Sequence, residues 1–527
     1  MEKVYEELDP TDKLSTNIFQ SGSIIIVQPP SSPATTESPS KRRKLDELGE
    51  DSIKLQKVWN TFKNTPDENF GVPFLQFSED VSYLFGKDDQ SNNITTLFIR
   101  KIYRHLSKII ERTGTRHFII IGNPGIGKTF FGYYLLYKLA QQNKTVIYHK
   151  HDMLPILFSN NTSYSGKKIY EFKNILANDD VWYIVDGSKP MNFTAKTILI
   201  SSPQKNNYKE FAKIGTTFQY MSVWSWEETD TCRAVLFPEL TQDFVRELYD
   251  RWGGIPRFTL FYALNRSQQC LLDKEINSVN ETIFNFIGES ADDNCAIHKI
   301  IHIYTNEPQE EGEETEEIED DPSSSKTPAV TEFYTMSILK FASDYVSEKV
   351  MDILIKNFKD HLLNFVRASS AIGDYGTLRG TIFERLAHRK LLKGGSFKVR
   401  PLIKNTATES IELQIPDREK LVFSNIGEIK PNMYCIPIQQ NHKSFDACVS
   451  PDTFFQMTIA KSHPIVKSGL DKYINKDNNS EIKFYFVLPK ELYNSYGEQD
   501  LHTAKKIVYR RKFNRLKQYA LEFDLKL

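Results

Sequence analysis

The hydrophobic pattern between residues 54 and 306 alternates short apolar runs with stretches of helix-like spacing. The runs are apolar on both faces, and they are residues 116–121, 144–149, 181–186 and 196–201. Strands that are apolar on both faces belong to mostly parallel sheets with helices on each side. The pattern therefore predicts an α/β domain over 54–306, and its last part, from residue 258 onward, is expected to be helical.

A second pattern follows in residues 331–527. A helix-rich stretch runs to about residue 392, and short β-like runs come after it. These runs are "SFKVRPL", "SIELQI", "KLVFS", "MYCIPI", "SFDACV", "FFQMTIA" and "IKFYFVLP". Such runs predict a second, separate α/β domain over 331–527. The chain contains no internal repeat.

Polar segments flank these two domains. Residues 1–30 end in "SIIIVQPP", a β-like run that two prolines stop and that is too small to be a domain. Residues 31–53 are rich in Ser, Thr, Pro and charge, and residues 307–330 are acidic, so neither can bury enough apolar surface to offset the entropy of ordering. We expect two disordered linkers. Lys41 to Lys44 form the basic cluster "KRRK", either a nuclear import address or a chance cluster.

The composition narrows the class of protein. A chain of 527 residues with 40% hydrophobic residues can fill two or three cores. No apolar run reaches the ~18 residues of a membrane span, and the N-terminus lacks the features of a secretory signal, so any export is expected to be unconventional. The five cysteines are scattered and form no CxxC, and the histidines form no HExxH, so we expect a reducing compartment and no zinc site.

The charge is unevenly distributed. The net charge is −1, yet residues 307–321 hold ten acidic side chains and no basic one, so the rest of the chain is basic. Residues 505–517, "KKIVYRRKFNRLK", carry seven basic side chains with aromatic residues between them. This pattern predicts a basic helix that suits the phosphate backbone of DNA, and a solvated charged face is an equal alternative.

One stretch carries a strong chemical signal. "GNPGIGKT" fits the phosphate-binding pattern G-x-x-x-x-G-K-[ST], with a predicted strand before it and a predicted helix after it. Glycines let backbone amides curl around phosphate, Lys128 neutralises the β- and γ-phosphates, and Thr129 ligates Mg²⁺. We therefore predict ATP and Mg²⁺ as cofactors, with GTP left open. The predicted binding residues are Gly122, Asn123, Pro124, Gly125, Ile126, Gly127, Lys128 and Thr129.

Three further residues are assigned to this site. Asp186 ends the apolar run "VWYIVD" as a Walker B acid does, and it is predicted to hold Mg²⁺ with Thr129. Gly187 follows it where an acidic residue often polarises water, so we expect slow hydrolysis or a base elsewhere. Ser201 ends another apolar run, either at a sensor position or in a simple Ser-Pro turn, and Arg257 in "WGGIPR" is placed where a second sensor arginine could reach phosphate. Glu228 in "VWSWEE" is interpreted as part of a helix-capping box.

The second domain carries a looser constellation. Glu384 lies on a predicted helix, Asp446 on a strand, and Gln456 on the strand after the turn "SPDT". Together these positions resemble the PD-(D/E)xK restriction-endonuclease core, in which carboxylates such as Glu384 and Asp446 hold Mg²⁺ and a lysine polarises water. Gln456 replaces a usual carboxylate and Thr458 the usual lysine, which weakens the prediction of cleavage.

The order of these motifs resembles the Crinkler family of oomycete and fungal effectors. The narrowest segments are "IIVQPP" before the phosphate loop and "FFQMTIAKSHPI" in the second domain. The resemblance implies a secreted effector that acts in the host nucleus, with an AAA-like ATPase joined to a nuclease-like domain. Residues 1–30 resemble only the last part of the family's ubiquitin-like header. The implied roles fall on Lys128, Thr129, Asp186, Ser201 and Arg257 for the ATPase, and on Glu384, Asp446 and Gln456 for the nuclease-like domain.

Three functions remain open at this point. The first is a Mg²⁺-dependent ATPase that controls how the second domain engages DNA or a host nuclear partner. The second is a DNA endonuclease regulated by the ATPase, and the third is a non-enzymatic nuclear scaffold that binds nucleotide. An import receptor is a further expected partner, and ring assembly into a homo-oligomer, common among AAA-like ATPases, is left open.

Overall fold

The computed structural model describes most of the two predicted domains. The described residues are 50–66, 73–87, 92–285, 297–308, 333–367, 376–404, 406, 408–423, 425–437, 444–471, 481–502 and 515–524. The predicted header remnant, the basic cluster at 41–44, most of the acidic segment and residues 505–514 lie outside them. None of the helices in the described part of the chain is long and apolar enough to cross a membrane.

The first domain is built on a seven-stranded sheet of order β6-β5-β4-β7-β8-β3-β9. Its strands are β3 (His117–Ile121), β4 (Val146–Lys150), β5 (Ile156–Phe158), β6 (Ser163–Ser165), β7 (Trp182–Asp186), β8 (Lys196–Ser201) and β9 (Thr217–Tyr220). All four predicted strands are present and lie parallel, as the apolar runs predict. The sequence missed β5, β6 and β9, which have three or four residues and so show little periodicity.

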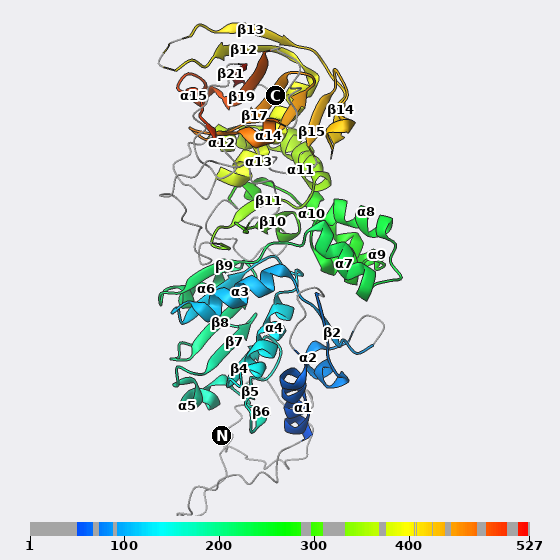
Figure 1. Cartoon of the computed structure of the whole chain (residues 1–527), viewed down its shortest axis with the longest axis vertical. Coiled ribbons are helices and arrows are strands. Elements are labelled where there is room, and N and C mark those ends of the chain that lie inside the picture. Colours follow the sequence, from blue (N-terminus) through cyan, green and yellow to red (C-terminus); the bar gives the residue numbers. More distant parts are fainter. Residues whose placement is uncertain are drawn as a thin grey trace, which may run out of the picture. The chain divides into compact units, whose positions relative to one another are not determined.

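Helices cover both faces of this sheet (Figure 1). Phe118 and Ile120 of β3 enter one apolar core, whereas Ile119 and Ile121 enter another on the opposite face. This alternation explains why β3 is apolar at every position. The helices are α1 (Glu50–Asn64), α2 (Ser82–Phe85), α3 (Lys101–Arg112), α4 (Lys128–Gln141), α5 (Lys173–Leu176) and α6 (Lys205–Ala212), and a two-stranded sheet pairs β1 (Phe74–Gln76) with β2 (Thr96–Phe98).

Helix α1 corrects the predicted end of the first linker. The disordered linker was expected to reach residue 53, but α1 begins at Glu50, and Glu50 pairs with Lys54 at 2.7 Å. Leu55, Trp59 and Phe62 lie on one face of this helix and are fully buried against the first domain. That burial stabilises a first turn whose own composition is polar.

A helical group follows the first sheet. It contains α7 (Trp226–Leu236), α8 (Gln242–Trp252), a π-helix (Arg257–Phe261), α9 (Arg266–Gln269) and α10 (Leu271–Asn277). The prediction of helix up to residue 306 is wrong at its end, because Ile301–Tyr304 form strand β10, which pairs antiparallel with β11 (Ile338–Phe341). A run of four apolar-rich residues fits a helix as well as a strand. The pairing with β11 determines that these residues form a strand. Figure 1 shows the two strands side by side.

The second domain is built on an eight-stranded sheet of order β13-β12-β21-β19-β17-β16-β15-β14. Every predicted run contains a strand. The strands are β12 (Gly395–Pro401), β13 (Ile411–Ile415), β14 (Lys420–Phe423), β15 (Tyr434–Pro437), β16 (Ala447–Val449), β17 (Thr453–Met457), β19 (Ile482–Pro489) and β21 (Leu516–Phe523), with β18 (Ile465–Val466) and β20 (Leu501–His502) as a separate pair. The helices are α11 (Asp344–Asn357), α12 (Lys359–Arg367), α13 (Gly376–Lys393), α14 (Lys467–Asp471) and α15 (Lys490–Tyr493).

Strand β21 corrects one further expectation. The predicted basic helix over 505–517 lies mostly outside the described residues, but Lys517 belongs to β21, which pairs parallel with β19. Leu521 and Phe523 are buried in the core of the second domain, and this burial fixes the segment as a strand.

Candidate active site

The phosphate-loop candidate connects the end of β3 to the start of α4. Gly125 and Gly127 adopt left-handed φ values of 87° and 91°, which glycine reaches without a steric cost. A Cβ at Gly122 would lie 2.7 Å from the carbonyl oxygen of Met221, closer than side chains tolerate. The turn therefore requires glycine at positions 125 and 127 because of their φ values, and the short distance to Met221 requires glycine at position 122.

The carbonyl groups of this loop are held from outside. Four of them accept hydrogen bonds from surrounding groups: Asn123 from Lys128 Nζ (2.7 Å), Gly125 from the Arg257 amide (3.3 Å), Ile126 from Trp224 Nε1 (2.8 Å) and Gly127 from Tyr103 Oη (2.6 Å). Within a planar trans peptide, the N–H group points opposite to the C=O group. The amides of Ile126, Gly127 and Lys128 consequently point away from these partners, as a concave anion site requires.

Lys128 begins α4 and is buried. Burial lowers the pKa of Lys128 to about 7, the nearby charge of Asp186 opposes that shift, and the charge of Arg257 adds to it. Its ammonium group donates to the Asn123 carbonyl, so the side chain folds back over the loop. A triphosphate at this place would favour the charged form of Lys128, because opposite charges at close range do so.

Asp186 ends β7 beside the loop. Burial raises the pKa of Asp186, and this shift is opposed by a hydrogen bond from Thr129, by the charges of Lys150 and Lys128, and by a bond from Tyr148 Oη at 3.4 Å. The structure thus brings Lys128, Thr129 and Asp186 together. The Thr129 hydroxyl and the Asp186 carboxylate are oxygen donors of the kind that Mg²⁺ prefers, so these residues fit that ion.

The two predicted sensor residues lie at the same edge of the sheet. Ser201 ends β8 and pairs with Ile121 of β3, but its side chain is only 1% exposed and its hydroxyl donates to the Ser202 carbonyl at 2.9 Å. Arg257 begins the π-helix, and its Nε lies 3.3 Å from the position of a Cβ on Gly125. Arg257 therefore borders the loop, whereas the Ser201 hydroxyl is already engaged.

Sequence reasoning missed Lys150. It ends β4 in register with Asp186, its charge acts on that carboxylate, and its Nζ donates to Tyr133 Oη at 3.1 Å. A rule was available to find it, because the carboxyl ends of neighbouring parallel strands meet at one edge.

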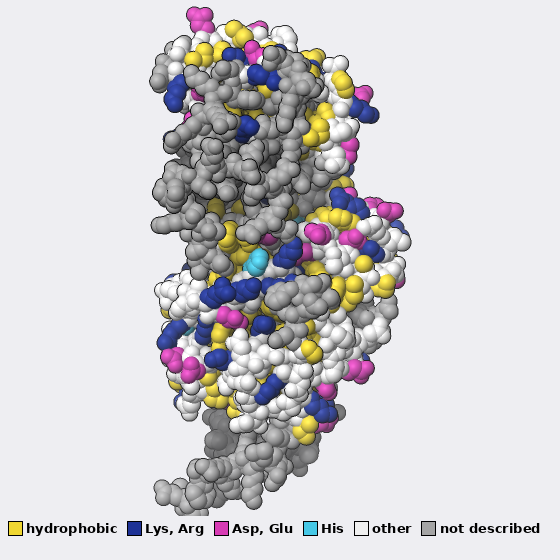
Figure 2. All heavy atoms as spheres, in the orientation of Figure 1, with side chains coloured by type: hydrophobic (Ala, Val, Ile, Leu, Met, Phe, Trp, Pro, Cys, Tyr) yellow, Lys and Arg dark blue, Asp and Glu magenta, His cyan; other side chains and the backbone are white. Residues whose placement is uncertain are grey.

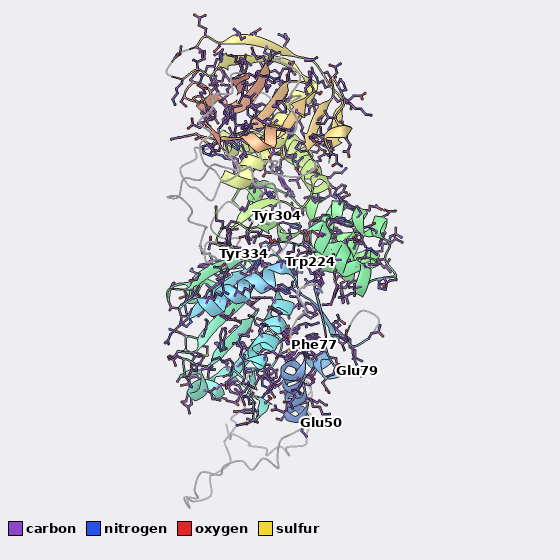
Figure 3. All side chains as sticks on the ribbon, in the orientation of Figure 1. Glu50, Phe77, Glu79, Trp224, Tyr304 and Tyr334 are labelled. Carbon is purple, nitrogen blue, oxygen red and sulfur yellow. The ribbon has the colours of Figure 1, made fainter. Side chains whose placement is uncertain are left out.

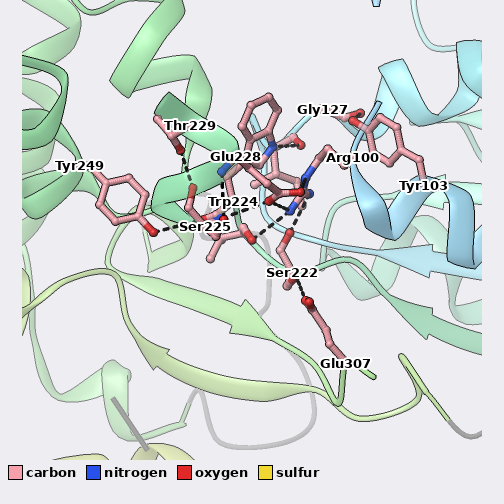
Figure 4. Close-up of polar contacts among 12 residues, drawn as sticks. Arg100, Tyr103, Gly127, Ser222, Trp224, Ser225, Glu228, Thr229, Tyr249 and Glu307 are labelled. Carbon is pink, nitrogen blue, oxygen red and sulfur yellow. Dashed lines mark hydrogen bonds and ion pairs between the residues drawn. The ribbon is translucent and has the colours of Figure 1, made fainter. Parts of the chain in front are cut away.

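Arg100 was also missed, and it supports the segment whose Trp224 bonds to the loop (Figure 4). Its fully buried guanidinium forms a two-pronged pair with Glu228, at 2.8 and 3.0 Å, and donates to the carbonyls of Ser222 and Val223. The predicted capping box of Ser225 and Glu228 is present. Glu228 thus has two partners, and together they fix the segment that carries Trp224.

Glu307 corrects the start of the acidic linker. It was expected to lie in a disordered segment, but it accepts a hydrogen bond from the Ser222 hydroxyl and is part of the network in Figure 4. Burial raises the pKa of Glu307, against that hydrogen bond and the charge of Arg100. The first acidic residue therefore belongs to the fold.

The second candidate site brings Glu384, Asp446 and Gln456 close together. Asp446 directly precedes β16, and its Oδ2 accepts hydrogen bonds from Gln456 Nε2 (2.7 Å) and from the Met457 amide (2.6 Å). Burial raises the pKa of Asp446 well above its usual range, and the charge of Glu384 adds to that shift. Gln456 and Thr458 are each only 5% exposed, so neither side chain faces open solvent.

Glu384 has a different environment from Asp446. Burial acts to raise the pKa of Glu384, but His388, whose Nε2 lies 3.6 Å from Glu384 Oε1, and the charges of Arg385 and Lys340 outweigh it, so the pKa is lowered. Two carboxyl groups whose pKa values are pushed apart can divide acid and base roles. Sequence reasoning missed Lys340, which comes from β11 and not from the strand that carries Thr458. Lys461, three residues after Thr458, is exposed.

The described residues contain no cluster of three or more His, Cys, Asp or Glu side chains that could hold a metal ion. At the second site the candidate ligands are two carboxylates, Glu384 and Asp446, and Gln456 already donates to one of them. A metal there would have to complete its coordination from water or substrate.

Comparisons with known proteins place the chain at a distance from its relatives. No family model matches it. It is 23% identical to Crinkler effector protein 15 of Phytophthora infestans over 74% of this chain and 62% of that protein, and 23% identical to Crinkler effector protein 16 over 74% and 61%. The chain thus spans about three fifths of these relatives. Among solved structures, the RuvB Holliday junction branch migration motor of Thermotoga maritima covers 33% of this chain and 62% of its own, at 14% identity and a TM-score of 0.23. The chain is a distant relative of the Crinkler effector proteins, which confirms the resemblance found in its motifs.

Proposed function

We propose that the chain binds ATP with Mg²⁺ at residues 122–129 and hydrolyses it. One arrangement carries this proposal: the loop carbonyls are held from outside, so three consecutive amides are available for phosphate beside Lys128, Thr129 and Asp186. A glycine-rich turn without that role would not need its carbonyls anchored by an indole, a phenol and an ammonium group.

The residues around the loop have different roles in this mechanism. The amides of residues 126–128 and the Lys128 ammonium bind and orient the phosphates. Thr129 and Asp186 would hold Mg²⁺, which supplies positive charge to the phosphate oxygens. Arg257 adds positive charge beside Gly125. Tyr103 and Trp224 keep the loop in the binding conformation.

The test is a substitution of Lys128. Lys128→Ala is expected to abolish phosphate release and to weaken the binding of ATP with Mg²⁺ in calorimetry. Lys57→Ala, an exposed lysine on α1, is the matched control and should behave like the parent. Equal turnover by Lys128→Ala and the parent would refute the assignment.

We further propose that the nucleotide state is communicated to the second candidate site. Asn123 of the loop is fully buried, and its side chain donates to the carbonyls of His298 and Ile301, both at 3.0 Å, and accepts from the Ile303 amide at 2.7 Å. Both the nitrogen and the oxygen of the Asn123 side-chain amide therefore form hydrogen bonds with β10. Any movement of the loop on nucleotide binding acts directly on this strand.

The path continues from β10 to β11. His302 of β10 pairs with Lys340 of β11, and the Lys340 ammonium lies 5.0 Å from the ring centroid of Tyr304, which is labelled in Figure 3. The charge of Lys340 acts on Glu384. Hydrogen bonds and strand pairing thus connect Asn123 to Lys340, and the last step, from Lys340 to Glu384, is electrostatic. Such a chain of neighbouring residues supports the coupling of the two sites.

A second candidate function is Mg²⁺-dependent DNA cleavage at Glu384, Asp446 and Gln456. The observation in its favour is that the fold brings these three residues together and separates the pKa values of the two carboxyl groups. Incubation of plasmid DNA with Mg²⁺ or Mn²⁺ tests it. Nicking that Asp446→Ala abolishes would support cleavage, and intact plasmid with every metal would exclude it. Tight ATP binding without phosphate release would favour the scaffold function.

DNA or host nuclear proteins are proposed as partners, because the relatives are named effectors and the folded part of the chain is basic. On the face drawn in Figure 2, a row of Lys and Arg side chains lies over α3. Lys101, Lys108 and Arg112 of this helix are exposed. We also propose that the protein is secreted, acts in the host nucleus and assembles into a ring-shaped homo-oligomer.

A further inference from the structure

Gly187 occupies the position after Asp186, where an acid that polarises water is expected, and it has no side chain for that task. The structure fills this place from the neighbouring strand. The Cβ of His151 lies 3.4 Å from where a Cβ on Gly187 would be, and the His151 amide donates to the Asp186 carbonyl at 2.8 Å. His151 thus lies in van der Waals distance of the place where a side chain of residue 187 would begin.

We propose that His151 is the general base of the ATPase and that Asp152 positions it; this inference rests on the proposed function. His151 and Asp152 directly follow β4, whose last residue, Lys150, is in register with Asp186. The pair therefore lies at the carboxyl edge of the sheet that also carries the loop, Asp186 and Ser201.

The two side chains form a dyad, which is an ion pair when His151 is protonated. His151 Nε2 lies 3.3 Å from Asp152 Oδ1, and Asp152 has a left-handed φ of 63°. That conformation is uncommon for a residue with a side chain, although Asp tolerates it better than most, and such residues concentrate at functional sites. The side chains are 71% and 85% exposed, so a proton taken up there can pass directly to solvent.

The oxygen of a water molecule forms a bond to the γ-phosphorus while the bond from that phosphorus to the bridging oxygen breaks, and ADP leaves with the bonding electron pair. The proton of the water passes to a ring nitrogen of His151, and the Asp152 carboxylate stabilises the imidazolium that forms. His151 then releases a proton to solvent, which leaves ADP, phosphate and one proton as products.

Substitution of His151 tests the proposal against a matched control. His151→Ala should bind ATP with Mg²⁺ within about two-fold of the parent in calorimetry, yet release phosphate at least ~100-fold more slowly in a single turnover. Rapid gel filtration should recover its bound nucleotide as intact ATP. His361→Ala removes another exposed histidine that is paired with a carboxylate, that of Glu281 at 2.8 Å, and should match the parent.

Two further measurements separate catalysis from structure. Added imidazole should restore part of the phosphate release of His151→Ala, which a merely structural defect would not allow. Asp152→Asn should slow release in the parent but have no further effect in His151→Ala. An equal effect of Asp152→Asn in both backgrounds would overturn the dyad, because Asp152 would then act independently.

The outcomes also separate this inference from the function on which it rests. A parent protein that binds and hydrolyses ATP, together with an equally active His151→Ala, overturns only the assignment of the base. A parent that binds no ATP, or binds it without releasing phosphate, refutes the proposed ATPase and the inference with it.

Discussion

The side-chain amide of Asn123 accepts a hydrogen bond from the main chain of Ile303 at 2.7 Å and, through its other atom, donates to the carbonyl of Ile301 at 3.0 Å. A residue of the phosphate loop is thereby built into the edge of strand β10. The loop and the β10–β11 pair are expected to respond to nucleotide as one unit.

Removal of this contact is expected to destabilise the protein. Asn123→Ala leaves two buried carbonyls and one buried amide without their partner, which costs about 2–4 kcal/mol. Urea unfolding should show a lower midpoint with an unchanged slope. Asn160→Ala is the control, because Asn160 is exposed and its side-chain hydrogen bonds to described residues are long, at 3.3 and 3.5 Å. An unchanged midpoint for Asn123→Ala would contradict the role given to it.

Nucleotide binding is expected to slow hydrogen–deuterium exchange in the β10–β11 pair. With ATP and Mg²⁺, hydrogen–deuterium exchange should slow in β10 and β11 as well as in residues 122–129, because Asn123 connects them. Strand β13, at the edge of the second sheet, is the internal control and should not change. Protection confined to the loop and α4 would show that the coupling is absent.

The anchoring of the loop carbonyls predicts a selective effect on affinity. Trp224→Phe keeps an aromatic ring but removes the Nε1 donor to Ile126, and loss of about 1 kcal/mol corresponds to a roughly five-fold weaker affinity for ATP. Calorimetry measures this change. Trp226→Phe, on the partly exposed neighbouring tryptophan, should leave the affinity as it is, and an equal loss in both variants would speak against the anchor.

His302 predicts how stability depends on pH. Its side chain is fully buried, neither ring nitrogen has a hydrogen-bond partner within the described part of the chain, and burial, with a smaller effect of His298, lowers the pKa of His302 to about 3. Between the unfolded value near 6.5 and about 3, the unfolded state binds a proton that the folded state does not. Stability is therefore fully present above pH 6.5 and falls on acidification, by up to about 1.4 kcal/mol per pH unit from this residue.

The matching variant is His302→Leu. Its free energy of unfolding should fall less steeply between pH 6.5 and pH 5, because no histidine titrates at that position. His361→Leu, at an exposed site, serves as the control. Equal slopes for the parent and His302→Leu would mean that His302 does not titrate as proposed.

The parts of the fold that the sequence predicts are those with local signals. The four strands of the first domain are apolar on both faces, and the glycine-rich loop has a fixed spacing, so both could be recognised from the residues alone. Strands β5 and β6 are three residues long, and β10 takes its state from β11 across the acidic segment, so no window of sequence specifies them. Pairing with other strands in the folded protein determines that these residues form strands.

The residues of the candidate site also fall into those with a local sequence signal and those without one. Lys128, Thr129 and Asp186 have motif positions, whereas Arg100, Lys150, His151 and Lys340 act from separate elements and carry no spacing rule. Their roles depend on which strand ends and helices become neighbours. Gly187 marked the absence of an acid in the sequence, but only the register of β4 against β7 shows which residue lies beside it.

The two ends of the acidic segment are tied to each other. The Asn306 side chain accepts hydrogen bonds from the amides of Thr335 and Met336, each at 2.9 Å, and the Asn306 carbonyl accepts one from the Tyr334 amide at 2.9 Å. Loop-closure entropy grows only with the logarithm of length, and a doubled loop costs roughly 0.6 kcal/mol. Insertions or deletions between Pro308 and Phe333 should therefore be nearly neutral for folding, which leaves the length and charge of that segment open to evolutionary change.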